Sequence, residues 1–230
     1  MASRSDRLDA QNQGEILQSA VVLCEGKRDA SFIHHFLANR RLSGFQVGFP
    51  DPTTSRGFGK DAFEDYLAAL RARRGFSRLR HLVVIADNDS DPRQAFQGVQ
   101  RQIRNAGYPV PKDVGITSGD SPPFTTVLML PGTGASGNLD TLLLKAALDG
   151  THPLHHCFEP FWQCCKVEEL PVGKASKMKL TTVVAASCQN NPSCSLVWVW
   201  SEKGNPISLS QACFDFLEDF FRTFQNPLAL

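Results

Sequence analysis

The chain has 230 residues, 42% of them hydrophobic and 20% charged, a composition typical of a globular protein with a core of its own. Its 24 basic and 23 acidic residues give a formal net charge of +1, so the overall charge points to no class of partner. No stretch approaches a membrane span in length and apolarity, and residues 1–14 lack the apolar core of a signal sequence. We therefore expect an intracellular, cytoplasmic protein with no membrane partner.

Strand-like and helix-like segments alternate along residues 15–150. Apolar runs of strand length cover residues 19–23, 45–49, 81–86 and 125–130. Helical periodicity covers residues 32–37, 60–70, 92–107 and 139–150, and Asp91-Pro92 is a typical helix entrance, with Asp91 as the N-cap. A short strand is expected at residues 114–116. This alternation predicts an α/β core with a mainly parallel sheet covered by helices on both faces.

The pattern changes after residue 150. Apolar residues recur at helical spacing over residues 154–165, 177–187 and 209–224, whereas residues 196–200 look extended. We expect residues 1–14 to form a flexible lead, residues 15–150 the core, and residues 151–230 a mostly helical extension packed on that core.

The cysteines give little sign of a metal site. They are seven in number, with no Cys-x-x-Cys pair. A weak zinc candidate is the group His155, His156, Cys157, Cys164 and Cys165. Because its spacing lacks the repeats of a typical zinc site, we expect buried, reduced thiols instead.

Acidic residues follow two of the predicted strands. Glu25-Gly26-x-x-Asp29 comes after the run at residues 19–23, and Asp87-Asn88-Asp89 comes after the run at residues 81–86. The carboxyl ends of parallel strands share one edge of a sheet, so these acids are expected to meet there. Acids gathered at one place repel each other unless a cation joins them. All-oxygen ligation favours Mg²⁺ or Mn²⁺ as that cation.

Together these two motifs resemble the TOPRIM signature, found in topoisomerases, bacterial primases and overcoming-lysogenization-defect nucleases. The resemblance covers roughly residues 18–150 and implies a Rossmann-like core with a metal-dependent nuclease site. Many TOPRIM sequences have glycine at the position of Pro92, so the chain departs from the pattern there. It looks most similar to small stand-alone TOPRIM-like proteins, because no topoisomerase tyrosine module or primase zinc ribbon accompanies the motifs.

The resemblance also suggests roles for individual residues. Glu25 is implied as a base or second-metal ligand, and Asp87 and Asp89 as metal ligands. Gly26 lets the backbone turn where a phosphate approaches. Asp29 is a supporting residue, or only a first-turn acid that complements the helix dipole.

Further candidates lie outside the two motifs. Asp140 is either a third acidic ligand or an ordinary first-turn acid, and the glycine-rich segment 131–137 is either a phosphate-binding loop or a flexible turn. Possible phosphate contacts, with solvated surface as the alternative, are Lys60, Lys174, Lys177 and Lys179. The basic residues Arg71, Arg73, Arg74, Arg78 and Arg80 either receive a polyanion beside the metal site or end a helix.

The leading hypothesis is therefore a Mg²⁺- or Mn²⁺-dependent nuclease that acts on DNA or RNA. The resemblance suggests that such a small protein acts with a partner, for example a separately encoded ATPase in a defence system, or as a homo-oligomer. The alternative is a catalytically silent metal- or nucleotide-binding module, suggested by Pro92 and by the aromatic residues of the C-terminal half. A phosphatase built around Asp87 ranks last, because it leaves the Glu25-Gly26 motif unexplained.

Overall fold

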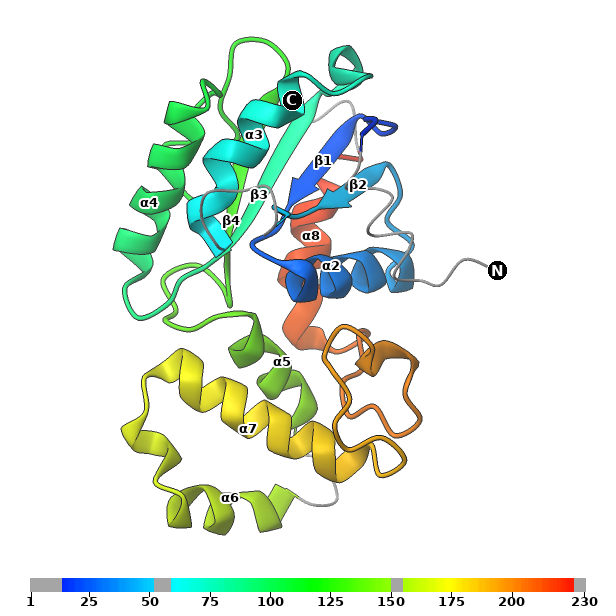
Figure 1. Cartoon of the computed structure of the whole chain (residues 1–230), viewed down its shortest axis with the longest axis vertical. Helices are drawn as coiled ribbons and strands as arrows, with labels where there is room; N and C mark the ends of the chain where they lie inside the picture. Colours follow the sequence, from blue (N-terminus) through cyan, green and yellow to red (C-terminus); the bar gives the residue numbers. More distant parts are fainter. Residues whose placement is uncertain (1–13, 52–58, 150–154, 226–230) are drawn as a thin grey trace.

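A parallel sheet of four strands, in the order β2-β1-β3-β4, forms the centre of the molecule (Figure 1). The computed structural model describes residues 14–51, 59–149 and 155–225. Within them the strands are β1 (Ala20–Leu23), β2 (Phe45–Gly48), β3 (His81–Asp87) and β4 (Phe124–Leu130). The predicted α/β fold with a parallel sheet is confirmed. The predicted flexible lead, residues 1–14, lies outside the described residues except for Gly14.

Helices cover both faces of the sheet. Helices α3 (Phe63–Arg71) and α4 (Pro92–Asn105) pack on one face, and α2 (Lys27–Asn39) and α8 (Asp215–Arg222) pack on the other. Successive side chains of a strand point to opposite faces, so Val21 and Val22 of β1 belong to different hydrophobic clusters. The near-continuous apolar runs of β1 and β3 are therefore the signature of strands buried on both sides.

The order of the strands reverses in the middle of the sheet. From β1 the chain crosses through α2 to β2 on one side, whereas β3 lies on the other side of β1 and leads through α4 to β4. In open α/β sheets, ligands bind at the carboxyl ends of the strands where this reversal occurs. That position lies between β1 and β3, whose carboxyl ends carry the two acidic motifs.

A helical layer extends beyond the sheet. It contains α5 (Leu139–Ala147), α6 (His155–Cys164) and α7 (Val172–Ser187), shown below the sheet in Figure 1. The N-terminal parts of α5 and α7 are in contact, because Thr141 Oγ1 donates a hydrogen bond to Ser176 Oγ at 3.0 Å. The predicted helical character of the C-terminal part is confirmed.

The last helix returns to the sheet. The Phe221 ring of α8 lies 5.1 Å from the Phe45 ring of β2 and 6.3 Å from the Phe36 ring of α2, centroid to centroid. Arg40 fixes the segment before α8, since its guanidinium donates to the carbonyls of Leu209 and Gln211 and pairs with Glu218 at 2.6 Å. Residues far apart in the sequence thus share one core with α2.

Some local predictions are confirmed and others are wrong. Asp91 is the N-cap of α4, because its Oδ1 accepts a hydrogen bond from the Gln94 backbone at 3.0 Å. Residues 196–200 do not form a strand: they include turns and the start of a 3-10 helix, Val199–Ser201. Residues 114–116 are a turn rather than a strand. Four further 3-10 helices in the described residues are Gly59–Ala62, Phe76–Arg78, Val167–Glu169 and Ala212–Phe214.

The cysteine prediction is wrong in part. All seven cysteines are free, but only Cys24 and Cys188 are buried. Cys157, Cys164 and Cys165 are exposed on α6 and just after it, because this helix forms the outer side of the helical layer. No helix in the described part of the chain is long and apolar enough to cross a membrane.

Candidate functional site

Glu25 and Asp87 meet at the carboxyl edge of the sheet. Glu25 lies just beyond β1, and Asp87 is the last residue of the neighbouring strand β3. The backbone N–H of Asp87 donates a hydrogen bond to Glu25 Oε1 at 2.8 Å. One carboxylate oxygen of Glu25 is thereby fixed against the end of β3. Its other oxygen, Oε2, faces Gly59, where a Cβ would lie only 3.3 Å away.

Asp87 also holds the start of α5. Its Oδ1 accepts a hydrogen bond from the backbone N–H of Leu139, the first residue of that helix, at 2.9 Å. An acid placed there is favoured by the unpaired amides and the positive end of the helix dipole. Asp87 thus connects two strands and a helix at one point.

A short turn carries Asp89 next to these residues. The buried side chain of Asn88, 1% exposed, donates hydrogen bonds to the carbonyls of Gly132 and Ala135, both at 2.7 Å. The backbone N–H of Gly137 donates to the Asp89 carbonyl at 2.6 Å. Asp89 has a left-handed backbone with φ of 53°, which is uncommon for a residue with a side chain. The glycine-rich segment 131–137 is therefore held against the Asp87-Asn88-Asp89 turn.

Burial and mutual repulsion perturb the acids of this edge. Burial raises the pKa of Glu25 to about 7, with further upward contributions from the charges of Asp29 and Asp89. Burial likewise raises the pKa of Asp29 to about 6. The pKa of Asp87 is raised well above its usual range by burial and then by the charges of Glu25 and Asp29. These acids form what we call the acidic cluster, defined as Glu25, Asp29, Asp87 and Asp89.

Gly26 does not play the conformational role predicted for it. It is the N-cap of α2 with φ of −157° and ψ of 178°, an extended backbone that other residues adopt. A Cβ there would lie 3.5 Å from Asp29 Oδ2, which is ordinary contact. The backbone amides of Asp29 and Gly26 hydrogen-bond to the Asp29 carboxylate, which opposes the effect of burial on its pKa. Asp29 therefore also caps the first turn of α2.

The structure pairs Asp140 with a cation instead of joining it directly to the cluster. Asp140 is 4% exposed and forms an ion pair with Arg28 of α2. Burial raises the pKa of Asp140, while the charges of Arg28 and Lys177 lower it. The Arg28–Asp140 pair joins α2 to α5 beside the cluster, and the charge of Asp140 still raises the pKa of Asp29.

The candidate phosphate-binding lysines have different positions. Lys60 forms an ion pair with Asp89 of the cluster. Lys177 is exposed on α7, and its charge lowers the pKa of Asp140 against the effect of burial. Lys179 pairs with Glu168 and lies over the Trp162 ring, 4.9 Å from its centroid. Its ammonium is therefore engaged by residues outside the acidic cluster.

The arginine-rich segment lies at the opposite edge of the sheet. It precedes β3, whose strand of seven residues separates it from Asp87 by about 20 Å at roughly 3.3 Å per residue. Arg73 lies over the Tyr66 ring at 4.5 Å, and Arg71 lies over the Tyr108 ring at 4.6 Å. The hypothesis that this segment lies beside the acidic cluster is wrong. The sequence already indicated this separation, because the arginines precede β3 and the acids follow it, at opposite ends of one strand.

The acidic cluster offers the right atoms for a divalent cation but not a complete set of ligands in place. Within residues 14–51, 59–149 and 155–225, no group of three or more histidine, cysteine or acidic side chains is arranged to hold a metal ion. Glu25 and Asp87 each engage one oxygen with a backbone amide and retain a second. Carboxylate oxygens suit Mg²⁺ and Mn²⁺. The ammonium of Lys60 already occupies the position of a cation at Asp89.

The weak zinc candidate is not supported in the part of the chain that can be described. Cys157 Sγ lies 3.3 Å from His156 Nε2, but among the described residues no third histidine, cysteine or acidic side chain joins them in a metal-binding arrangement. The side chain of His155 lies outside the described residues.

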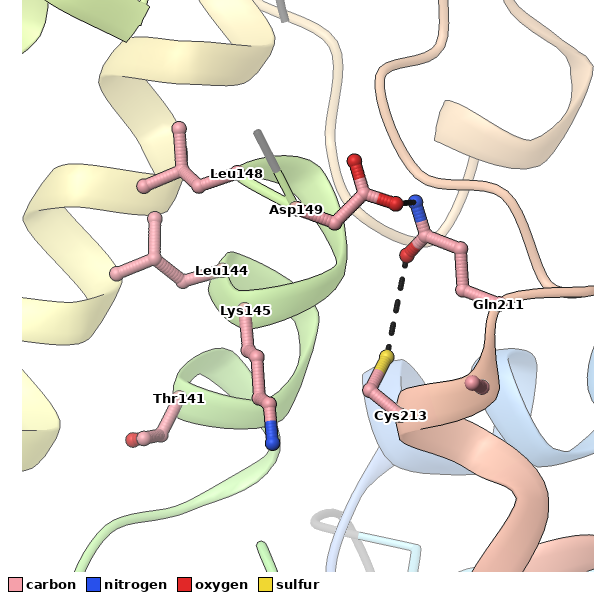
Figure 2. Close-up of a pocket in the computed structure, with 8 residues that line it drawn as sticks. Thr141, Leu144, Lys145, Leu148, Asp149, Gln211 and Cys213 are labelled. Carbon is pink, nitrogen blue, oxygen red and sulfur yellow. Dashed lines mark hydrogen bonds between the residues drawn. The ribbon is translucent and has the colours of Figure 1, made fainter. Parts of the chain in front are cut away.

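A separate pocket lies away from the cluster, between α5 and residues 211–213 (Figure 2). Its volume is about 690 Å³. At its rim, the side chain of Gln211 donates a hydrogen bond to Asp149 Oδ2 at 2.7 Å, and Lys145 projects from α5. No member of the acidic cluster lines it.

Sequence reasoning missed two contributors to the site. Asn88, between the two aspartates of its motif, was not recognised as the residue that fixes the 131–137 loop. Arg28, inside the Glu25-Gly26-x-x-Asp29 motif, was not recognised as the partner of Asp140. The only signal for either was its place within an acidic motif, because both partners are distant in the sequence.

Comparison with known proteins places the chain in a family without assigning it an activity. No curated protein and no solved structure gives a significant match. Residues 19–225 match the family model described as a protein of unknown function, DUF3226. Because the match spans the sheet, the acidic cluster and the helical layer, the chain belongs to the DUF3226 family.

Proposed function

We propose that this protein is a divalent-metal-dependent nuclease that hydrolyses phosphodiester bonds of DNA or RNA at the acidic cluster. The observation that carries the proposal is the contact between Glu25 and Asp87 at the reversal point of the strand order, with Asp89 two residues further on. Carboxylates that burial and neighbouring charges perturb this strongly are typical of functional sites. Such a cluster does not stabilise the fold by itself, since each added acid increases the electrostatic repulsion among the carboxylates.

The cluster residues would hold Mg²⁺ or Mn²⁺ through Glu25, Asp87 and Asp89. When bound, such a cation polarises a phosphodiester and lowers the pKa of an attacking water. The protein contributes the positions of the oxygens, because the Asp87 amide orients Glu25 and the Leu139 amide orients Asp87. The absence of a side chain at Gly59 leaves room beside Glu25 Oε2.

Basic residues around the cluster support a polyanionic substrate. Lys60 is in the 3-10 helix just before α3, Arg28 is in the first turn of α2, and exposed Lys174 and Lys177 lie near the start of α7. The start of α7 touches the start of α5, since a Cβ at Gly173 would lie 2.9 Å from Asn138 Nδ2. The charges of Lys60, Arg28 and Lys177, from three separate elements, therefore act on the acidic cluster or on the adjacent Asp140, and basic residues of this kind suit a phosphate backbone bridged by a cation.

The direct test is cleavage of plasmid DNA and of RNA with Mg²⁺ or Mn²⁺ by the wild type, Asp87→Asn and Asp91→Asn proteins. Asp87→Asn removes a cluster charge but retains an oxygen for the Leu139 amide. Asp91→Asn is the matched control, because asparagine also serves as an N-cap for α4. We expect cleavage by the wild type and by Asp91→Asn and its loss in Asp87→Asn. Equal cleavage by all three proteins, or no metal-dependent cleavage of either substrate, would contradict the proposal.

A second candidate is a metal- or nucleotide-binding module without turnover. It is favoured by one observation, the lack of a ready three-ligand group in the described residues. Stoichiometric Mn²⁺ binding in calorimetry, lost in Asp87→Asn, together with no hydrolysis of either nucleic acid, would select it. A protein partner, such as a separately encoded ATPase, stays a prediction under both candidates.

A further inference from the structure

We propose that Lys60 is a resident counter-cation of the acidic cluster, which holds Asp89 in the metal-free protein and competes with the divalent cation for that carboxylate. This inference rests on the proposed function, because it concerns how the same site takes up its metal. It assigns Lys60 a role before substrate arrives, in addition to the phosphate contact predicted from the sequence.

The first support is the position of the Lys60 side chain. Lys60 lies in the 3-10 helix Gly59–Ala62, yet its ammonium reaches Asp89, 29 residues later in the chain. The Lys60 side chain is 27% exposed, whereas that of its partner Asp89 is 56% exposed. The lysine is thus the more buried of the two partners. A typical surface ion pair, by contrast, joins two solvated side chains.

The charges around Lys60 give the second support. Burial acts to lower the pKa of Lys60, but the hydrogen bond and charge of Asp89 and the charge of Glu25 raise it above its usual value. In return, the charge of Lys60 lowers the pKa of Glu25 against the effect of burial. Arg28, a cation in the first turn of α2, forms its ion pair with Asp140. Lys60 therefore supplies positive charge at the place where the acids repel each other.

The backbone around Asp89 makes the exchange of cations feasible. The Asp89 carbonyl accepts from Gly137, and Asn88 fastens the adjacent loop, so the main chain of the turn is fixed. The Asp89 side chain is the exposed part. In the proposed exchange, rotation of this side chain would release Lys60 and let the Asp89 carboxylate join those of Glu25 and Asp87, while the hydrogen-bonded main chain of the turn stays in place.

The test is isothermal calorimetry of Mn²⁺ binding to the metal-free full chain, with Lys60→Gln as the main variant. A divalent ion that no longer displaces an ammonium binds more tightly, so we expect a decrease in Kd of roughly 3- to 10-fold, the equivalent of about 0.7 to 1.4 kcal/mol. Lys60→Arg keeps the charge and the pairing and should bind Mn²⁺ no more tightly than the wild type. Lys177→Gln is the matched control, because it removes an equal charge near the site from a lysine that does not pair with Asp89.

The unmodified protein gives an independent readout. Mg²⁺ titration followed by NMR of the lysine ammonium groups should shift the Lys60 signal in step with metal binding, as its ion pair with Asp89 is replaced.

Each outcome bears on the inference. Tighter binding by Lys60→Gln alone, with the NMR shift, supports it. Unchanged or weaker binding by Lys60→Gln overturns it while wild-type Mn²⁺ binding leaves the proposed function standing. Equal tightening by Lys177→Gln overturns it as well, because the effect would then be one of net charge. Absence of Mn²⁺ binding by the wild type overturns the inference and the proposed function together.

Discussion

The two edges of the sheet carry opposite charges that are neutralised in different ways. At the amino edge, three of the arginines have local partners: Arg73 lies over Tyr66 and donates to its hydroxyl at 3.1 Å, and Arg74 and Arg78 approach Glu15 at 3.7 and 3.6 Å. At the carboxyl edge, burial and neighbouring acids raise the pKa values of Glu25, Asp29 and Asp87, and Lys60 pairs with the fourth acid, Asp89.

Under the proposed function, this difference separates charges that serve the fold from charges that await a ligand. Aromatic faces and single carboxylates are enough to accommodate a surface arginine. Buried carboxylates that repel each other reduce stability and persist only where another requirement keeps them there. The proposed function therefore assigns a structural role to the charges of the amino edge and a ligand-binding role to those of the carboxyl edge.

The largest expected effect is on cleavage and distinguishes the two edges directly. Glu25→Gln retains an acceptor for the Asp87 amide but removes a cluster charge, so we expect metal-dependent cleavage to fall by at least ~100-fold. Arg73→Gln should change the cleavage rate by less than about twofold, because Arg73 lies at the amino edge, away from the acidic cluster, and its partner Tyr66 belongs to the core. Rates measured on one nucleic-acid substrate with Mn²⁺ check both values. Comparable losses in the two variants would remove the functional distinction between the edges.

The next effect is on the stability of the acidic edge. Asn88→Ala leaves the Gly132 and Ala135 carbonyls without their buried donor, so we expect the free energy of unfolding to fall by about 2 to 3 kcal/mol. Asn105→Ala is the control, because Asn105 makes an exposed hydrogen bond to Glu64 and should cost less than about 1 kcal/mol. Urea unfolding at neutral pH measures both. Equal losses would show that the loop does not depend on Asn88.

The pH dependence should differ in sign between the edges. The folded pKa of Glu25 is about 7 against 4.5, and that of Asp29 is about 6 against 3.8, so the folded state binds more protons than the unfolded state in between. The free energy of unfolding therefore falls as the pH rises from about 4 to about 7. At the amino edge, burial and then the charge of Arg80 lower the pKa of His81, so the folded state binds fewer protons there than the unfolded state. Through His81, the free energy of unfolding therefore rises as the pH rises toward the usual pKa of histidine.

Glu25→Gln isolates the acidic contribution. In metal-free buffer, the free energy of unfolding of the wild type should fall between about pH 5 and about pH 8. We expect the fall in Glu25→Gln to be smaller by about 1 to 2 kcal/mol. Urea unfolding at the two pH values, with EDTA present, gives the difference. A wild type that gains stability relative to the variant over this range would show that the cluster is not under repulsion.

The smallest effect is expected at the amino edge. Glu15→Gln removes a carboxylate that lies 3.7 Å from Arg74 and 3.6 Å from Arg78, but the Arg74 side chain is 86% exposed. Exposed pairs of this kind contribute little, so thermal unfolding should shift by the equivalent of less than about 0.5 kcal/mol. A loss above about 1 kcal/mol would mean that this edge, too, is an electrostatic network.

Local chemistry in the sequence was enough to predict much of the fold and the neighbourhood of the acids. Continuous apolar runs gave β1 and β3, and Asp91-Pro92 gave the start of α4. Placing Glu25 and Asp87 on one edge required only that their strands be parallel. These features depend on residues close together in the chain, which is why a sequence pattern carries them.

Other features depend on contacts that no local pattern contains. Residues 196–200 are rich in β-branched and aromatic residues, yet the Ser195 carbonyl accepts from the amides of Trp198 and Val199, and Trp200 packs on Phe32 at 5.8 Å. Tertiary packing thus overrides strand propensity. The pairs of Arg28 with Asp140 and of Lys60 with Asp89 are 112 and 29 residues apart, so neither interpretation of Asp140, as a third ligand or as a first-turn acid, included its ion pair.

The hydrogen bond between Asp87 and the first amide of α5 has a mechanical consequence. The same carboxylate that faces the sheet edge anchors a helix whose other neighbour is α7. Under the proposed function, a cation bound to this carboxylate would alter its hydrogen bond to the first amide of α5, so binding at the edge would also affect the helical layer. The exchange rate of the Leu139 amide proton with solvent deuterium is therefore a built-in reporter of what happens at the edge.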